Sequence, residues 1–217
     1  MRKLLLVIVI AAVTLLNSTS STEGFVNENK MVLNETNRVQ TEQNEVQQSN
    51  LNTYTVQEGE SVSDIAVEYG VPVEDLVTVN NLEGETVEDG EKLVIPETVS
   101  SEEKDLMARL VNAEAKGECY EGKVAVATVV LNRVDSPKFP DTITEVINAK
   151  NQFSPVSNGS INQKPSKEAI HAVNEAIALQ EEGTDATFFY NPNATNDKWI
   201  KSLPVIEKIG NHNFATS

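Results

Sequence analysis

Glu114 is a carboxylate at a position where its helix pattern calls for an apolar side chain. Met107, Leu110, Val111 and Glu114 are spaced i, i+3, i+4 and i+7, so they share one helix face. Burial disfavours the charged form of a carboxyl group and raises its pKa, as a general acid requires near neutral pH. The alternative is a glutamate at the edge of the apolar stripe, paired with a lysine or arginine. The pattern makes Glu114 the first candidate for acid catalysis.

Glu118 is the nearest second carboxylate after Glu114. It follows Gly117, which we expect to end the helix, so Glu118 leaves the helical face. Two carboxylates can act together in catalysis, one as a general acid and the other as a general base or nucleophile. Glu118 is therefore a possible second carboxylate, with capping or charge pairing as its alternative role.

Zinc and cysteine chemistry have less support in the sequence. A catalytic zinc needs about three protein ligands, often histidines, and the chain has only His171 and His212. Cys119 is the single cysteine, which excludes an intrachain disulfide and a cysteine-based zinc site. A peptidase using Cys119 and His212 is a further alternative, although a lone cysteine beside a helix end is more often inert. We expect no metal and no cofactor.

The segment from residue 100 onward predicts a mainly helical domain. Ser100 and Glu103 fit a capping box at the start of a helix over 101–117. A helix over 121–134 is apolar on nearly every side, which is typical of a helix buried at the centre of a fold. The other expected pieces are a loop at 136–140, a short helix from Asp141 to Ala149, loop or hairpin pieces at 152–155 and 158–159, a helix from 165 or 166 to about 180, a strand at 187–190 and a weakly alternating tail at 206–214.

A smaller domain is predicted between residues 54 and 97. Alternation begins at Tyr54, Ser61 and Asp64 can cap a helix, and Gly70 can end it. A second short helix at 73–79 and a strand at 92–96 complete the order strand, helix, helix, strand. The predicted fold class is α+β, with this βααβ domain ahead of the helical domain at 100–217.

The N-terminus predicts export. Residues 1–22 combine Arg2 and Lys3 with an apolar run and small polar residues, as a secretory signal peptide does, with an uncleaved anchor as the alternative. Residues 23–53 are rich in Asn, Gln, Glu and Thr, which predicts a disordered tether. The formal charge of −16 argues against non-specific nucleic-acid binding, because that requires a basic face. We expect a secreted monomer.

Residues 54–96 resemble the LysM module. The resemblance is carried by Tyr54-Thr55-Val56, Gly59, Ser61, Ile65-Ala66, Tyr69-Gly70-Val71, Leu76, Asn80-Asn81-Leu82 and Leu93-Val94-Ile95-Pro96. It implies binding to glycans that contain N-acetylglucosamine, such as peptidoglycan, in a groove between two loops. The loop residues that correspond here are Gly59, Glu60, Ser61, Val62, Asn81 and Leu82.

Residues from about 106 to 214 resemble the SleB/CwlJ family of cell-wall hydrolases, the spore cortex-lytic type. The motifs are Ala113-Glu114-Ala115-Lys116-Gly117-Glu118, Glu121-Gly122, Val129-Val130-Leu131-Asn132-Arg133-Val134, Gln152-Phe153-Ser154, Tyr190-Asn191-Pro192, Lys198-Trp199-Ile200 and Ile209-Gly210 with His212 and Phe214. The resemblance implies a catalytic domain similar to lysozymes and lytic transglycosylases, with Glu114 as the general acid.

Five further residues are candidates for the substrate cleft of such a domain: Gln152, Phe153, Tyr190, Asn191 and Trp199. Amide groups suit acetamido substituents, and aromatic rings suit sugar faces. Together the two resemblances imply a cell-wall-associated enzyme that cleaves the glycan strand between N-acetylmuramic acid and N-acetylglucosamine, as a lytic transglycosylase rather than a muramidase. An N-acetylmuramoyl-L-alanine amidase and a non-catalytic wall-binding protein are the alternatives.

Overall fold

The structure is a computed structural model that describes residues 52–217. The predicted signal peptide and tether, residues 1–51, lie outside the described residues. Within 52–217, no helix combines the length and apolar character that crossing a membrane requires.

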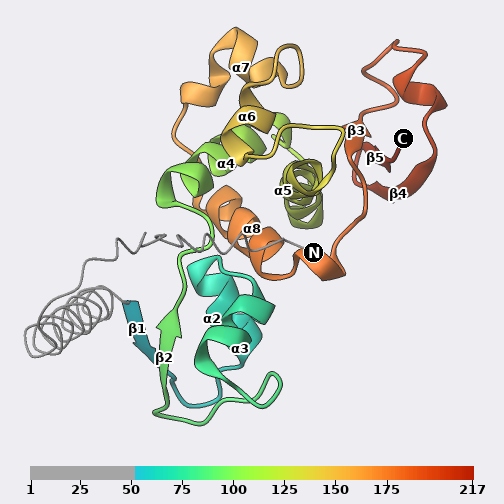
Figure 1. Cartoon of the computed structure of the whole chain (residues 1–217). Coiled ribbons are helices and arrows are strands. Elements are labelled where there is room, and N and C mark those ends of the chain that lie inside the picture. Colours follow the sequence, from blue (N-terminus) through green and yellow to red (C-terminus); the bar gives the residue numbers. More distant parts are fainter. Residues whose placement is uncertain (1–51) are drawn as a thin grey trace, which may run out of the picture. The chain divides into compact units, whose positions relative to one another are not determined.

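Residues 52–96 form the predicted strand, helix, helix, strand unit (Figure 1). Its strands pair antiparallel, with Tyr54 opposite Leu93. Ser61 and Asp64 complete a reciprocal capping box at the first helix, and Gly70 ends that helix in the left-handed conformation, both as predicted. The elements are β1 (Asn52–Thr55), α2 (Val62–Tyr69), α3 (Val73–Asn80) and β2 (Lys92–Ile95).

The remaining residues form a helical assembly with a small sheet at its C-terminal end. Its α-helices are α4 (Ser101–Glu114), α5 (Tyr120–Asp135), α6 (Ile143–Asn148), α7 (Ser154–Asn158) and α8 (Lys167–Ala178). Its short 3-10 helices are η1 (Ser160–Asn162), η2 (Gln180–Glu182) and η3 (Ile200–Ser202). Its strands are β3 (Phe188–Tyr190), β4 (Val205–Ile209) and β5 (His212–Ala215). The predicted α+β class is confirmed.

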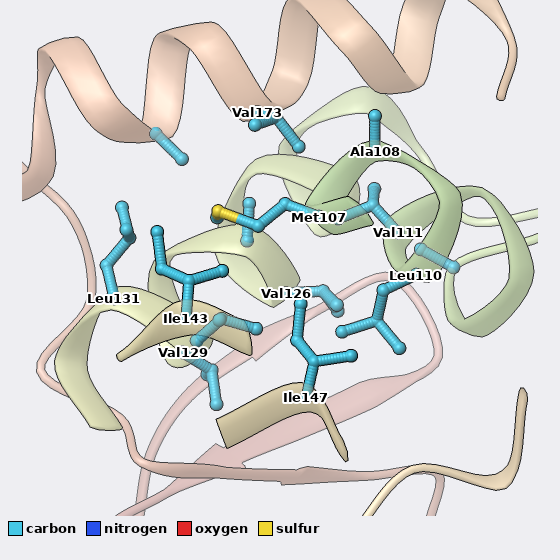
Figure 2. Packing of buried hydrophobic residues seen from close by; sticks show 14 of the residues in the cluster. Met107, Ala108, Leu110, Val111, Val126, Val129, Leu131, Ile143, Ile147 and Val173 are labelled. Atoms are coloured by element: carbon cyan, nitrogen blue, oxygen red, sulfur yellow. The ribbon is translucent and has the colours of Figure 1, made fainter. Parts of the chain in front are cut away.

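Helix α5 is the centre of this assembly, as its apolar sequence predicted. It contacts α4, α6, α8 and β3, and it lies among the helices in Figure 1. Its residues from Ala125 to Leu131 are all buried. Figure 2 shows the cluster in which Met107 and Val111 of α4 meet side chains from α5, α6 and α8. Each such side chain contributes about 1.5–3 kcal/mol by leaving water. This packing fixes the direction of α4 and therefore the place of Glu114 at its end.

The C-terminal sheet has the strand order β3-β5-β4, and both pairs are antiparallel. Phe189 lies opposite Phe214, and the turn between β4 and β5 contains Gly210 at a φ of 56°. The tail that the sequence described only as weakly alternating is thus a hairpin, whose second strand carries β3 on its other edge.

Several predicted boundaries are corrected by the structure. Residues 154–158 form a helix rather than a loop or hairpin, since Pro155 sits in its first turn, where a missing backbone N–H costs nothing. Thr142, not Asp141, caps α6, because its hydroxyl accepts from the backbone N–H of Glu145. Helix α4 ends at Glu114, before Gly117. Helix α8 starts after Ser166 and ends at Ala178.

Helices α2 and α8 are in contact. Asn174 Nδ2 donates to the carbonyl oxygen of Glu68 at 3.0 Å, and Lys104 Nζ donates to that of Tyr69 at 2.7 Å. Ala178 is buried in the same apolar cluster as Ile65. Residues 52–217 accordingly form one compact unit.

Candidate functional site

Glu114 is the last residue of α4 and opens onto a cavity of about 360 Å³. Its side chain is half-buried, and Ser154 Oγ donates to its Oε1 at 3.4 Å. The lining residues come from the end of α4, the segment 151–153 before α7, α7 itself and strand β3: Glu114, Asn151, Gln152, Phe153, Ser154, Ser157 and Phe189. The packing of α4 therefore places the Glu114 carboxyl group in a cavity that is otherwise lined by amides, hydroxyls and two phenyl rings.

The surroundings of Glu114 favour its protonated form. Burial raises the pKa of Glu114 above its ordinary value, while hydrogen bonds from Ser154 and the charge of Arg133 partly oppose that rise. The C-terminal end of a helix carries partial negative charge, which acts in the same direction as burial. A carboxyl group held this way can donate a proton nearer to neutral pH than an exposed glutamate can.

Arg133 is a buried cation behind the cavity wall. Its side chain lies among three phenyl rings, with its guanidinium carbon 5.0 Å from the ring centres of Phe139 and Phe153 and 5.5 Å from that of Phe188. Its Nε donates to the Thr187 carbonyl oxygen at 2.8 Å. The guanidinium thus ties α5 to the start of β3 and to the segment that carries Phe153.

The structure brings together three of the predicted site residues: Glu114, Gln152 and Phe153 all line the cavity. Phe153 is otherwise buried, and its ring stacks on Phe189 with centres 6.5 Å apart. Asn151, Ser154, Ser157 and Phe189 also line the cavity and were missed as site residues. Ser154 stands in the same motif as Gln152 and Phe153, so proximity in the sequence could have found it, whereas nothing local singles out Phe189 from Phe188.

Tyr190, Asn191 and Trp199 do not line this cavity. Tyr190 is buried, and its hydroxyl accepts a hydrogen bond from Asn213 Nδ2 at 3.3 Å. Asn191 Oδ1 accepts from the backbone N–H of Asn193, which stabilises the turn after β3. Trp199 is 57% exposed and packs edge-on against Phe188. Successive strand residues face opposite sides, so Trp199 lies with Phe188, away from the Phe189 side.

Glu118 faces the β4–β5 turn rather than the cavity. Its carboxylate accepts from the backbone N–H of Asn211 at 2.9 Å and from Asn211 Nδ2 at 3.0 Å, and it lies 3.9 Å from His212 Nδ1. Burial by itself would raise the pKa of Glu118, but the Asn211 hydrogen bonds, His212 and Lys123 lower it below its ordinary value. This geometry matches the pairing role that was the alternative for Glu118.

The two histidines lie in different surroundings. His171 is on α8, where its Nδ1 contacts the Tyr120 hydroxyl. His212 is on β5, and burial lowers its pKa while Glu118 opposes that change. Among residues 52–217, no three His, Cys, Asp or Glu side chains are grouped so that they could hold a metal ion. Cys119 is exposed at the start of α5.

The predicted glycan-binding loops of residues 52–96 are tightly structured. Glu60 accepts hydrogen bonds from the Tyr54 hydroxyl and from the backbone N–H of Gln57, and Ser61 is engaged in its capping box. Val62 is fully buried, so it presents no surface to a ligand. Gly59 and Asn81 have φ values of 82° and 53°, and Leu82 packs against the core of this unit. Gly59, Ser61 and Asn81 are the exposed residues among these six loop positions.

The two predicted domains match known families. Residues 117–215 match the family described as Cell Wall Hydrolase, and residues 54–96 match the LysM domain. Glu114 lies just before the first of these segments. The chain therefore carries a LysM domain followed by a cell wall hydrolase domain, and both resemblances read from the sequence motifs are confirmed.

Relatives and solved structures agree with these matches. A spore cortex-lytic enzyme of Halalkalibacterium halodurans is 42% identical over 120 residues, which cover 55% of this chain and 36% of that protein. The catalytic domain of the Bacillus cereus SleB protein is 40% identical with a TM-score of 0.50, covering 56% of this chain and 95% of that structure. The catalytic domain of the germination-specific lytic transglycosylase SleB from Bacillus anthracis is 37% identical with a TM-score of 0.51, covering 56% and 100%. The match thus spans well under half the length of the H. halodurans relative.

Proposed function

We propose that this chain is a peptidoglycan hydrolase that cleaves the glycan strand between N-acetylmuramic acid and N-acetylglucosamine as a lytic transglycosylase, with Glu114 as its catalytic acid. The observation that carries this proposal is the position of Glu114. It is a half-buried carboxyl with a raised pKa, and it is the only carboxylate lining its cavity within the described residues.

The proposed reaction needs a single carboxyl group. A glycosidic oxygen is a poor leaving group until it is protonated, and the Glu114 carboxyl donates that proton. The carboxylate that remains then accepts the proton of the muramic acid 6-hydroxyl, whose oxygen attacks the anomeric carbon and closes a 1,6-anhydro ring. No water is consumed, and Glu114 ends the cycle protonated as it began.

Within the described residues, no second carboxylate lines the cavity beside Glu114. Retaining glycosidases place their two carboxyl groups about 5–5.5 Å apart, and inverting enzymes about 6.5–9.5 Å apart. Glu118, the nearest second carboxylate in sequence, is hydrogen-bonded to Asn211 and does not line the cavity.

The rest of the cavity lining suits a sugar. The amides and hydroxyls at 151, 152, 154 and 157 offer hydrogen bonds, and Phe153 and Phe189 offer an apolar wall for a sugar face.

The LysM domain supports a wall-bound location for this activity. We propose that residues 54–96 bind N-acetylglucosamine-containing glycan and keep the protein, secreted as a monomer, on the cell wall. Purified walls should sediment the full chain more completely than a chain lacking 54–96. Equal sedimentation would contradict a binding role for this domain.

The decisive experiment is mass spectrometry of the products from purified peptidoglycan. Anhydro-muramic ends would support the transglycosylase, and their absence with Glu114→Gln would tie them to the proposed acid. Reducing muramic ends would mean hydrolysis, and a second carboxylate would then be required. Free stem peptides would replace the proposal with an amidase, and intact glycan would leave a wall-binding protein.

A further inference from the structure

Arg133 is a buried charge without a carboxylate partner. Its residue is 5% exposed, and among residues 52–217 no carboxylate lies within ion-pair distance of it. Burial lowers the pKa of Arg133 to about 10, with Glu114 opposing, so it stays charged at neutral pH. Burying a cation is costly, and an apolar side chain of similar size would fill the same space without that cost. The charge therefore calls for an explanation beyond packing.

The contacts of Arg133 lead directly to the cavity. Its Nη1 donates to Gln152 Oε1 at 3.3 Å, while its Nε is held by the Thr187 carbonyl oxygen. A guanidinium group has only donors, so the atom of the Gln152 amide that faces it must be the oxygen. The Gln152 NH2 group then points away from Arg133. Because Gln152 lines the Glu114 cavity, the side-chain group it offers there is a hydrogen-bond donor.

We propose that Arg133 is a positioning residue that orients the Gln152 amide, so that its NH2 group recognises the acetamido carbonyl oxygen of an N-acetylated sugar beside Glu114. This inference rests on the proposed function. A carbonyl oxygen accepts from the NH2 group, whereas the ammonium group of a de-N-acetylated sugar can only donate. That ammonium group would also be repelled by the buried guanidinium. The site therefore selects N-acetylated over de-N-acetylated glycan.

The same guanidinium acts on Glu114 through its charge. Ser154 from α7 and Arg133 from α5 both lower the pKa of Glu114 against the larger effect of burial, and the β3 neighbour Phe189 is uncharged. Replacing Arg133 with an uncharged side chain should therefore raise the pKa of Glu114. In an activity profile, the alkaline limb, where the acid loses its proton, would move to higher pH. A residue needed only for packing would not move that limb.

The test compares N-acetylated glycan fragments of peptidoglycan with the same fragments after de-N-acetylation. We expect the full chain to favour the acetylated fragments in kcat/KM. Gln152→Leu and Arg133→Met should each reduce that preference by about tenfold, as losing one hydrogen bond would. Arg133→Met should also shift the alkaline limb upward, and Gln152→Leu should not. Arg133→Lys retains the charge but cannot donate to both Thr187 and Gln152 as the planar guanidinium does. This variant should therefore leave the alkaline limb in place and lose the preference for acetylated fragments.

Arg109→Met is the matched control. Arg109 also donates to a backbone carbonyl, that of Ile161, and pairs with Asp105, but it does not line the cavity. This variant should change neither the preference nor the limb. If Arg133→Met lowered kcat/KM equally on both kinds of fragment and left the alkaline limb of the pH profile unchanged, Arg133 would be a packing residue only. Full preference in Gln152→Leu would overturn the acetamido assignment.

A second readout separates this inference from the proposed function. This readout is the NMR signal of the Gln152 NH2 group in the full chain carrying Glu114→Gln. The signal can be assigned because it disappears when Gln152→Leu is added. Acetylated fragments should shift that resonance, and de-N-acetylated fragments should not. If acetylated fragments shift the signal but the parent chain cleaves no glycan, the proposed function is refuted and the role of Gln152 stands. If the parent chain cleaves glycan but the signal does not shift, the role of Gln152 is refuted and the proposed function stands.

Discussion

Ser154 Oγ donates a hydrogen bond to Glu114 Oε1, and this contact joins the first residue of α7 to the last residue of α4. The two residues stand 40 positions apart in the chain. Both residues line the cavity, and their contact stabilises the charged form of Glu114 against the effect of burial.

Removing the Ser154 hydroxyl should make Glu114 a weaker acid. Ser154→Ala takes away a donor to the carboxylate, so the pKa of Glu114 should rise further above its ordinary value. The alkaline limb of kcat/KM should consequently move to higher pH, which a pH series on soluble glycan would measure. Ser157→Ala is the control, since Ser157 lines the same cavity but donates to the Ser154 carbonyl oxygen. A limb that stays in place in Ser154→Ala would contradict this role.

Glu114→Gln should abolish cleavage while leaving the fold intact. An amide fills the same space but has no acidic proton, and general acid–base catalysis contributes about 10²- to 10⁴-fold to rates. Product release from peptidoglycan measures the loss, and thermal unfolding followed by circular dichroism measures the fold. Activity above about a tenth of the parent value would remove Glu114 from the mechanism.

Glu118→Gln should destabilise the protein rather than change its chemistry. Both Asn211 hydrogen bonds weaken or lose a partner, which costs about 1–3 kcal/mol in the free energy of unfolding. The pKa of Glu118 is lowered in the folded state, so its contribution is present above the ordinary value of 4.5 and is lost as pH falls through the folded pKa. The difference between parent and variant should therefore shrink in acid, as denaturant unfolding at several pH values would show.

Gly210→Ala offers an independent check on the same contact. Gly210 has a positive φ, and a Cβ there would collide with Glu118 Oε2. Strain of about 1–2 kcal/mol is expected from the backbone alone. If Glu118 anchors the hairpin, combining both substitutions should cost less than the sum of the two. Simple additivity would mean that the two residues act separately.

The fluorescence of Trp199 tests whether bound glycan extends beyond the Glu114 cavity to the Phe188 side of β3. It is the single tryptophan of the chain and is 57% exposed, so its emission has one source. If Trp199 stacks on a sugar, soluble glycan added to the Glu114→Gln protein should shift this emission. Trp199→Ala should weaken binding by about 0.5–1.5 kcal/mol, measurable by calorimetry. Unchanged emission at saturating glycan would leave Trp199 as a surface partner of Phe188 only.

Local patterns in the sequence determined the elements and the leading residue of this protein. The buried helix α5, the caps at Ser61, Ser100 and Ser166, and the left-handed stop at Gly70 all follow from spacing and residue type within one helix. The same periodicity placed Glu114 on a buried face. These features are predictable because they depend on neighbours within a few residues.

Only the tertiary structure decided what surrounds Glu114. Ser154 of α7 and Phe189 of β3 reach the cavity because of the way their elements pack, and the prediction of a loop at Ser154 missed a helix. Glu118, a plausible catalytic partner by sequence, is instead taken up by Asn211, 93 residues away. The sequence places Arg133 in a helix but does not predict the phenyl rings around it or its contact with Gln152. Such contacts depend on how whole elements pack, because side chains from distant segments compete for the same few hydrogen-bond partners.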